Sequence, residues 1–187
     1  MANTAANVSA GKPKVTGAIW TAPLGTDLPE DTSEALDGFA CLGYCSDDGL
    51  TNSTNLESET IKAWGGDTVL TIQKSKEDTY GFKLIEVLNV DVLKFVYGDD
   101  NVSGSLGSGI VLRANNQELP ERVIVIDMIM RDNTAKRVVI PSCKIKEIGD
   151  IVYSDSEAVG YEVTVACTPD SDGNTHYEYI RKSTVSA

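Results

Sequence analysis

The sequence is poor in the residues that catalytic and metal sites use most often. It holds one histidine, His176, and four cysteines, Cys41, Cys45, Cys143 and Cys167, in 187 residues. No serine or cysteine lies in a recognised nucleophile motif, and one histidine is a weak basis for acid–base catalysis. Acids are abundant, but nothing in the pattern selects one pair of carboxylates from the others. We therefore expect a protein that is not an enzyme and that binds no cofactor.

Basic residues are also scarce. Lysine and arginine number 16 against 28 aspartates and glutamates, which gives a net charge of -12. The deficit is greatest in residues 1–60, which hold two lysines and nine acids. This excess of negative charge repels phosphate backbones and anionic membranes, so we do not expect nucleic-acid binding by charge.

Long apolar runs are absent as well. No run is long enough to span a bilayer, and MANTAANVSAGKPK, residues 1–14, is small and polar where a signal peptide has an apolar segment. We expect a protein made in the cytosol, without a membrane anchor and with reduced thiols. The alternative is a zinc site, but one Cys-x3-Cys pair followed by two separated cysteines is a poor ligand pattern, which favours buried thiols and no metal.

The composition is that of a folded chain, with 41% hydrophobic and 24% charged residues. The length fits one domain, which we place at residues 18–187. Residues 1–17 show no periodicity and include a proline near their end, so we expect an N-terminal arm.

Alternating apolar and polar side chains predict strands through most of the domain. Residues 39–45 predict a strand that ends in a turn at SDDG, residues 46–49. RVIVIDMIM, residues 122–130, is apolar on both faces apart from one aspartate, so a second sheet or a partner must supply the missing wall. Residues 159–167 and 176–183 predict a terminal hairpin. Pro141 is expected at an edge or a bulge.

One helix is expected. In LIEVLNVDVLKFVYG, Asn89 is placed to cap a helix over residues 90–97, and Gly98 ends it. A strand is the alternative, because Val92 and Phe95 have low helix propensity. The next segment, residues 98–109, is rich in glycine and serine and predicts a mobile loop; it lacks the lysine that a phosphate-binding loop needs.

The stretch ETIKAWGGDTVLTIQ, residues 59–73, predicts a hairpin with Gly65-Gly66 as a two-residue connection. It places the aromatic Trp64 at the mouth of the turn. Trp64 either folds back over its own sheet or is covered by another molecule. The preceding polar run, Leu50–Thr60, has strand propensity but little to bury, so we expect it to be extended and either exposed or in contact with a partner.

A calcium loop is a further alternative near the C-terminus, where Asp170, Asp172 and Asn174 are spaced like ligands. The glycine has the wrong offset, and Arg181 occupies the place of the closing glutamate. Turn chemistry is the favoured explanation.

Five stretches in order resemble the major tail tube proteins of long, non-contractile-tailed bacteriophages that infect Gram-positive bacteria. They are GAIWTAPLGTDLP, LGYCSDDGL, ESETIKAWGGDTV, LIEVLNVDVLKFVYGDDNV and TPDSDGNTHYEY, which together extend over nearly the whole chain. The resemblance rests on their order and spacing. It implies a mainly β fold, a β-sandwich or barrel of two packed antiparallel sheets with one flanking α-helix.

The resemblance also implies a function. Copies of such a protein form hexameric rings, and the rings stack into a tail tube that serves as the conduit for DNA ejection. The implied partners are further copies of the chain and the tape-measure, tail-terminator and tail-tip proteins; the implied location is the virion tail, after assembly in the host cytoplasm. The acidic composition suits a tube in which DNA slides without sticking.

Unpaired strand edges and apolar surfaces then become candidate contacts between subunits or rings. The candidates are Trp64, Gly65 and Gly66 in the hairpin, Val123 and Val125 in the two-sided strand, and Leu50, Thr51, Asn52 and Ser53 in the polar run. The alternative function is a monomeric ligand- or carbohydrate-binding β-sandwich that uses Trp20, Trp64 and Tyr177 as an aromatic platform. Such a module stays monomeric at high concentration, whereas a tube protein assembles.

Overall fold

Strands dominate the structure, a computed structural model that describes residues 3–182. The first two residues of the expected N-terminal arm and the last five of the expected domain lie outside the described residues. The strands are β1 (Lys12–Pro13), β2 (Ile19–Pro23), β3 (Ala40–Cys41), β4 (Cys45–Lys62), β5 (Thr68–Leu84), β6 (Val102–Ser105), β7 (Gly109–Leu112), β8 (Arg122–Ile129), β9 (Thr134–Ile148), β10 (Tyr161–Cys167) and β11 (Tyr177–Lys182). The α-helix is α1 (Val90–Tyr97), and short 3-10 helices are η1 (Ala5–Asn7), η2 (Asp99–Asn101) and η3 (Arg131–Asn133).

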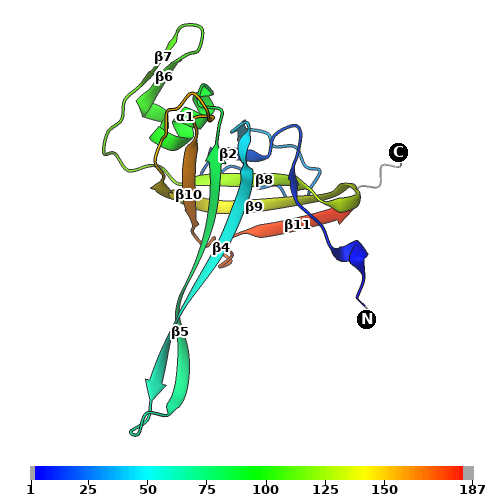
Figure 1. Ribbon diagram of the computed structural model, residues 1–187, viewed down its shortest axis with the longest axis vertical. Coiled ribbons are helices and arrows are strands. Elements are labelled where there is room, and N and C mark those ends of the chain that lie inside the picture. The colour runs from blue at the N-terminus through cyan, green and yellow to red at the C-terminus, as the bar shows by residue number, and fades with distance from the viewer. Residues whose placement is uncertain (1–2, 183–187) are drawn as a thin grey trace.

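Two layers of antiparallel strands face each other, which confirms the mainly β sandwich with one α-helix. Strands β8, β9 and β11 run across β4, β5 and β10 (Figure 1). Hydrogen bonds follow the order β3-β2-β8-β9-β10-β5-β4, with β1 also on β8 and β11 also on β9. Strand β9 belongs to both layers, because residues 134–139 pair with β11 and residues 143–148 pair with β10.

The passage of β9 between the layers coincides with an irregularity. Opposite it on β8, Arg122 pairs with Cys143 and Ile124 pairs with Ile140, so β9 contains one residue more than β8 over this interval. Pro141 lies in this bulge, as the sequence predicts, because its missing N–H prevents a regular ladder.

The core fills the space between the two layers and α1. Phe95 on α1 stacks on Phe82 of β5 with ring centroids 6.3 Å apart, and Tyr97 packs edge-on against Tyr161 of β10 at 5.7 Å. Alternate residues of the strands complete the core: Ile19, Tyr80, Phe82, Leu84, Ile124, Ile126, Val138, Ile140, Val163 and Val165.

Helix α1 has the predicted bounds. The Asn89 side chain accepts a hydrogen bond from the Asp91 amide at 3.0 Å, and Gly98 follows the last turn with φ 94°. Val92 and Phe95, whose propensities argued for a strand, are both buried in the core. Tertiary packing therefore outweighs local propensity here.

One predicted turn and one predicted loop are wrong. Residues 46–49 lie within β4, where the pairing jumps from Cys45 opposite Leu84 to Leu50 opposite Phe82, so the turn residues form a bulge. The glycine-rich residues 98–109, expected to be a mobile loop, contain η2, strand β6 and the turn that leads into β7, with which β6 pairs as a hairpin.

The predicted terminal hairpin is also wrong. Strands β10 and β11 do not pair with each other; both pair with β9, at different places along its length. The cause is the bend of β9, which carries β10 into one layer and β11 into the other. Alternation predicts a strand's faces but not its neighbour.

Candidate assembly interface

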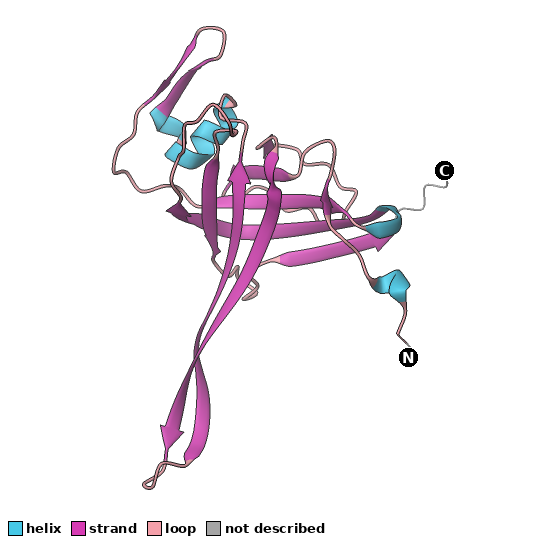
Figure 2. Ribbon diagram, in the orientation of Figure 1, coloured by secondary structure: helices cyan, strands magenta, loops and turns pink. Residues whose placement is uncertain are grey.

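Strands β4 and β5 continue far beyond the sandwich as a two-stranded ribbon, which remains strand almost to its end (Figure 2). Every residue from 51 to 76 is exposed. We call residues 51–76 the arm. An isolated two-stranded ribbon is marginally stable in water, so this exposed arm is the feature of the chain that most needs a partner.

The arm ends in a loop that carries Trp64. The Ala63 amide donates to the Asp67 carbonyl at 2.8 Å, and the Gly66 amide donates to the Ala63 carbonyl at 3.0 Å. The hairpin is confirmed, but its two-residue connection is wrong, because the strands end at Lys62 and Thr68. Gly65 and Gly66 have φ of 119° and 99°, which only glycine adopts without strain.

Trp64 does not fold back over its own sheet. Its relative exposure is 107%, the highest of the large hydrophobic side chains in the described chain. Beside it, Ile61 and Leu70 face each other across the ribbon, and Ile72 lies further along the same face. We call these four exposed side chains the arm tip.

Both edges of the arm lack a strand neighbour within the described chain. Strand β4 is the last strand of the sheet, so its outer edge is free along its length. The other edge of β5 pairs with β10 only between Thr79 and Leu84. Unpaired N–H and C=O groups of this kind accept a strand from another molecule.

The predicted segment Leu50–Ser53 lies at the root of the arm. Leu50 is partly buried against the core opposite Phe82, whereas Thr51, Asn52 and Ser53 are exposed on β4. The structure thus brings two predicted groups, the polar run and the Trp64 loop, onto one free-edged ribbon.

A buried carboxylate fixes the root of the arm to the sandwich. Asp78 on β5 accepts hydrogen bonds from the hydroxyls of Thr54 on β4, at 2.6 Å, and Thr175, and pairs with Lys76 at 2.9 Å. Its side chain has no exposed surface. Burial raises the pKa of Asp78, but the hydrogen bonds from Thr175, Thr54 and Lys76 outweigh it and lower the pKa to about 2. The charged form therefore stabilises this junction.

The single histidine packs beside this junction. The ring of His176 lies edge-on to Tyr80, with centroids 5.6 Å apart. Among the described residues, no group of three or more His, Cys, Asp or Glu side chains is placed to hold a metal ion.

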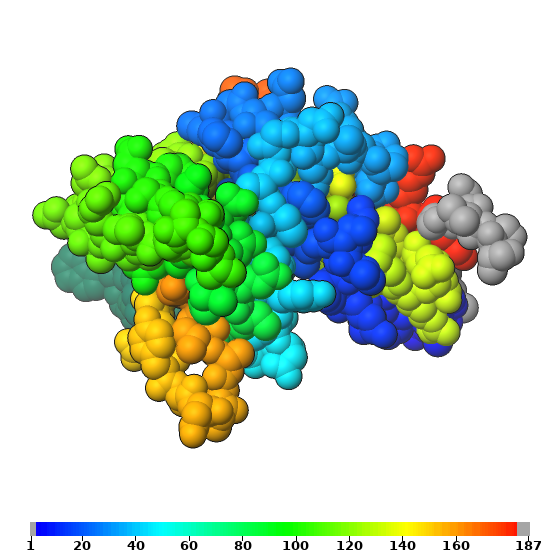
Figure 3. All heavy atoms as spheres, turned by 90° about the horizontal axis from the view of Figure 1, so that it is seen from above, coloured from blue at the N-terminus to red at the C-terminus, as the bar shows by residue number. Residues whose placement is uncertain are grey.

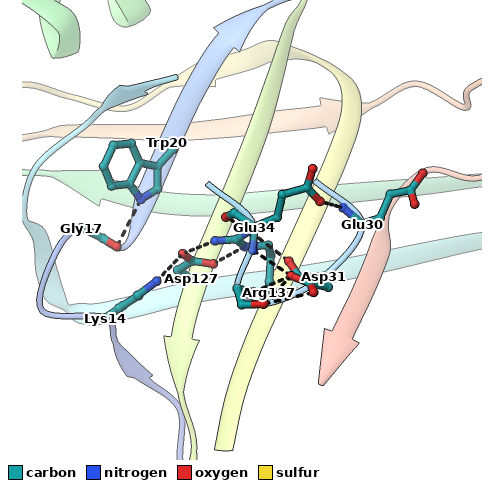
Figure 4. Close-up of polar contacts among 9 residues, drawn as sticks. Lys14, Gly17, Trp20, Glu30, Asp31, Glu34, Asp127 and Arg137 are labelled. Atoms are coloured by element: carbon teal, nitrogen blue, oxygen red, sulfur yellow. Dashed lines mark hydrogen bonds and ion pairs between the residues drawn. The ribbon is translucent and has the colours of Figure 1, made fainter. Parts of the chain in front are cut away.

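The prediction that Val123 and Val125 contact a neighbouring subunit is wrong. Both side chains have no exposed surface in the single chain, so they offer no surface to a neighbour. The wall that the sequence assigned to a second sheet or a partner is supplied by the chain itself. The segment between β2 and β3 is held on this side of the sheet by Arg137, whose guanidinium donates to the carbonyls of Asp31 and Glu34 at 3.0 and 2.9 Å (Figure 4).

The aspartate of the two-sided strand anchors that wall. Asp127 and Arg137 lie opposite each other on β8 and β9, and the guanidinium binds both carboxylate oxygens, at 2.7 and 2.8 Å. Lys14 adds a third contact at 3.2 Å (Figure 4). Both members of the central pair are buried, so the charges balance each other away from water.

The N-terminal segment lies along the free edge of β8. Lys12 and Pro13 pair with Ile129 and Met128, and the Lys14 amide donates to the Asp127 carbonyl at 3.2 Å. Figure 3 shows the segment, in dark blue, against the turn between β8 and β9, in yellow-green. The division into an N-terminal arm of residues 1–17 and a domain of residues 18–187 stays a prediction.

The acidic cluster near the C-terminus makes a turn. The Asp170 carboxylate accepts hydrogen bonds from the amides of Asp172 and Asn174, each at 2.9 Å, and from the Tyr177 hydroxyl at 2.6 Å. The hydrogen bond from Tyr177 is the main cause of the lowered pKa of Asp170.

No helix among residues 3–182 is long and apolar enough to cross a membrane.

Comparison with known sequences decides the family. A profile of the family described as phage tail tube protein matches residues 2–187. The chain belongs to the phage tail tube protein family. Membership makes it a structural protein of a phage tail, with self-association into a tube as the family's role.

Other comparisons add little to this assignment. The search of curated proteins finds no match. A solved structure described as the anti-feeding prophage cap, a tube terminating cap, matches over 95% of this chain and 98% of that chain, with a TM-score of 0.43 and 8% identity.

Sequence reasoning missed two features of this tail tube protein. It ended the return strand of the hairpin near Gln73, although Asp78, Tyr80, Phe82 and Leu84 continue the alternation, so the length of the arm was lost. It also gave Asp127 no partner, although the turn at residues 131–133 brings Arg137 opposite it on the next strand. The continuation of β5 could have been found from the alternation of its residues. The partner of Asp127 could have been found from the register of β8 and β9 across their turn.

Proposed function

We propose that this chain assembles with further copies of itself into hexameric rings, which stack into a tail tube through which phage DNA is ejected. The arm carries the proposal. It has two free edges, no core of its own and an apolar tip around Trp64.

The physical argument is that a neighbouring copy completes what the single chain leaves open. Pairing along the arm satisfies backbone groups that otherwise bond only to water, and burial of the tip removes apolar surface from solvent. In a ring or a stack, the arm would contact a different surface on the next copy. A contact of this head-to-tail kind closes into rings or extends into filaments, both of which a tube contains.

The proposed contact residues lie on the arm and at its root. They are Trp64, Gly65, Gly66, Thr51, Asn52 and Ser53 on the arm, and the partly buried Leu50 at its root. Val123 and Val125 are excluded because the chain buries them itself. The N-terminal segment, residues 1–17, is a second proposed contact region, because its pairing with β8 extends over only two residues.

The remaining parts of the proposal rest on the family. The tape-measure, tail-terminator and tail-tip proteins are proposed as partners, with assembly in the host cytoplasm and the virion tail as the final location. The net charge of -12 favours a lumen that repels DNA phosphates rather than binding them.

The alternative of a carbohydrate-binding platform finds no single surface here. Trp64 lies in the loop of the arm, Trp20 lies on β2 and donates its ring N–H to the Gly17 carbonyl at 3.3 Å, and Tyr177 begins β11. These aromatic residues share neither a strand nor a turn.

The experiment is substitution at the tip. We expect Trp64→Ala to reduce tube or ring formation at least tenfold, because it removes the largest apolar side chain of the tip. The free energy of unfolding of the monomer should change by less than about 0.5 kcal/mol, because the side chain has no contacts to lose. Negative-stain electron microscopy measures assembly, and urea unfolding measures stability.

Tyr153→Ala is the matched control. Tyr153 is an aromatic residue outside the arm with a relative exposure of 78%, so its removal changes surface hydrophobicity without touching the tip. A folded Trp64→Ala protein that assembles as readily as the Tyr153→Ala protein contradicts the proposed role of the arm.

A further inference from the structure

Two of the four cysteines lie directly opposite each other in the sheet. Cys143 on β9 is the register partner of Cys167 on β10. The next pair along is hydrogen-bonded, because the Thr168 amide donates to the Ser142 carbonyl at 2.8 Å. In an antiparallel ladder the two kinds of pair alternate, so the two cysteines form a non-hydrogen-bonded pair.

This kind of pair has the spacing that a disulfide needs. Its Cα atoms lie about 4.5 Å apart, and its side chains project on the same side of the sheet. Disulfides span Cα separations of about 4.4 to 6.8 Å, so the backbone does not have to move far for the two sulfur atoms to bond.

The surroundings of the two thiols differ. Cys143 is buried in the core, and its Sγ donates to the Arg122 carbonyl at 3.4 Å. Cys167 packs against the same core but keeps part of its surface exposed. A small reagent therefore reaches Cys167 first.

We propose that Cys143 and Cys167 are an oxidative modification site, at which a small disulfide such as oxidised glutathione converts the two thiols into a cross-strand disulfide. The Cys167 thiolate attacks the reagent, forms a mixed disulfide and releases one reduced glutathione. The Cys143 thiolate then attacks the Cys167 sulfur and releases the second. Two electrons and two protons pass from the protein thiols to glutathione, and one sulfur–sulfur bond replaces another.

The reduced chain resists this reaction at neutral pH. Burial raises the pKa of Cys167 to about 12 and also raises the pKa of Cys143, so few thiolates are present. Oxidation is consequently slow rather than unfavourable, and it proceeds faster at alkaline pH.

The disulfide would form beside the bulge at which β9 passes from one layer to the other. It would tie β9 to β10 at that point and close a loop of about 25 residues, which stabilises the chain mainly by restricting the unfolded state. This inference concerns the single chain and does not depend on the proposed tube.

The experiment uses the full chain and oxidised glutathione. Tryptic peptides separate the cysteines, because Cys143 lies in residues 138–144, Cys167 in residues 147–181, and Cys41 with Cys45 in residues 15–62. After incubation at about pH 8.5 and blocking of free thiols, mass spectrometry should find the peptide 138–144 linked to 147–181. The midpoint of thermal unfolding should rise by roughly 5–10 °C.

Two variants make the assignment specific. The double variant Cys41→Ala, Cys45→Ala should still form the link, whereas Cys143→Ala should stop at a glutathione adduct on Cys167. To remove the effect of slow reaction, the chain is also unfolded and refolded in a glutathione redox buffer. Free Cys143 and Cys167 in the refolded protein, or a persistent adduct on Cys167 when Cys143 is present, would overturn the proposal.

Discussion

Asp127 and Arg137 illustrate how single residues decide which surfaces of this chain are available. Their pairing across β8 and β9 lets Arg137 hold two carbonyls of the segment between β2 and β3, and that segment covers the face of Val123 and Val125. From sequence alone, this apolar face suggests an interface. The structure shows that this face is covered by the chain itself, because the register of β8 and β9 places the buried Arg137 where it binds the covering segment.

Arg137→Ala should destabilise the chain by about 3–5 kcal/mol, because it leaves the buried Asp127 carboxylate without its main partner. Urea unfolding followed by tryptophan fluorescence measures the change. Arg137→Lys is the control: it keeps the charge but loses the two-point contact, so an intermediate loss is expected. Equal stability of the wild type and Arg137→Ala would contradict the anchoring role.

Asp78 gives a prediction that depends on pH. Its carboxyl titrates near 3.8 when unfolded and at about 2 when folded, so its stabilisation is complete above a pH of about 4 and is lost as the pH falls through 2. Asp78→Asn should therefore lower the free energy of unfolding by about 2 kcal/mol at pH 7, with the difference shrinking towards pH 2. Urea unfolding at a series of pH values measures it. A difference that does not depend on pH would argue against the charge as the cause.

At the scale of elements, the sequence predicts what local patterns control and misses what register controls. The caps at Asn89 and Gly98 define α1, and alternation defines β10 and both faces of β8. The neighbours of β10 and β11 were mispredicted because both depend on a bend in β9, which local patterns near those strands do not encode. The glycines of β6–β7 likewise suggested mobility where they make the turns of a hairpin.

For the candidate interface too, local sequence patterns predict some features, whereas features that depend on distant parts of the chain could not be predicted. Exposure of the polar run could be predicted, since it has little to bury, whereas the sequence leaves open whether Trp64 folds back over its own sheet. The length of the arm follows only in part. Alternation from Asp78 to Leu84 indicates that β5 continues beyond Gln73, but the extent of the pairing depends on fourteen paired positions and two bulges along β4 and β5 beyond the one at Cys45. Burial of Val123 and Val125 could not be predicted either, since it depends on a segment far away in sequence.

The arm should be dispensable for folding. Replacing residues 57–75 with Asn-Gly joins Leu56 to Lys76 by a tight turn and keeps the contacts of Asp78 with Thr54, Thr175 and Lys76. We expect a folded monomer whose unfolding midpoint lies within a few degrees of the wild type, because the removed residues contribute nothing to the core. Circular dichroism and size-exclusion chromatography test this; an unfolded product would show that the arm stabilises the single chain.

At the scale of the whole molecule, the sandwich is complete and the arm is not. Within the chain, α1 packs on the core, and Asp127 pairs with Arg137. Residues 51–76, in contrast, have free strand edges and an apolar end. In the proposed tube, the same arm on every copy would repeat the same contact. The net charge of -12 would keep single copies apart until that contact forms.

Negative-stain electron microscopy of the concentrated full-length protein tests this account most directly. We expect rings or tubes of uniform diameter, whose number rises with protein concentration and with added salt, which screens the repulsion between acidic copies. The protein that lacks residues 57–75, prepared in the same way, should show none. Monomers alone at every concentration and salt, also after addition of tail-tip components, would contradict the central claim that the arm is completed by another copy.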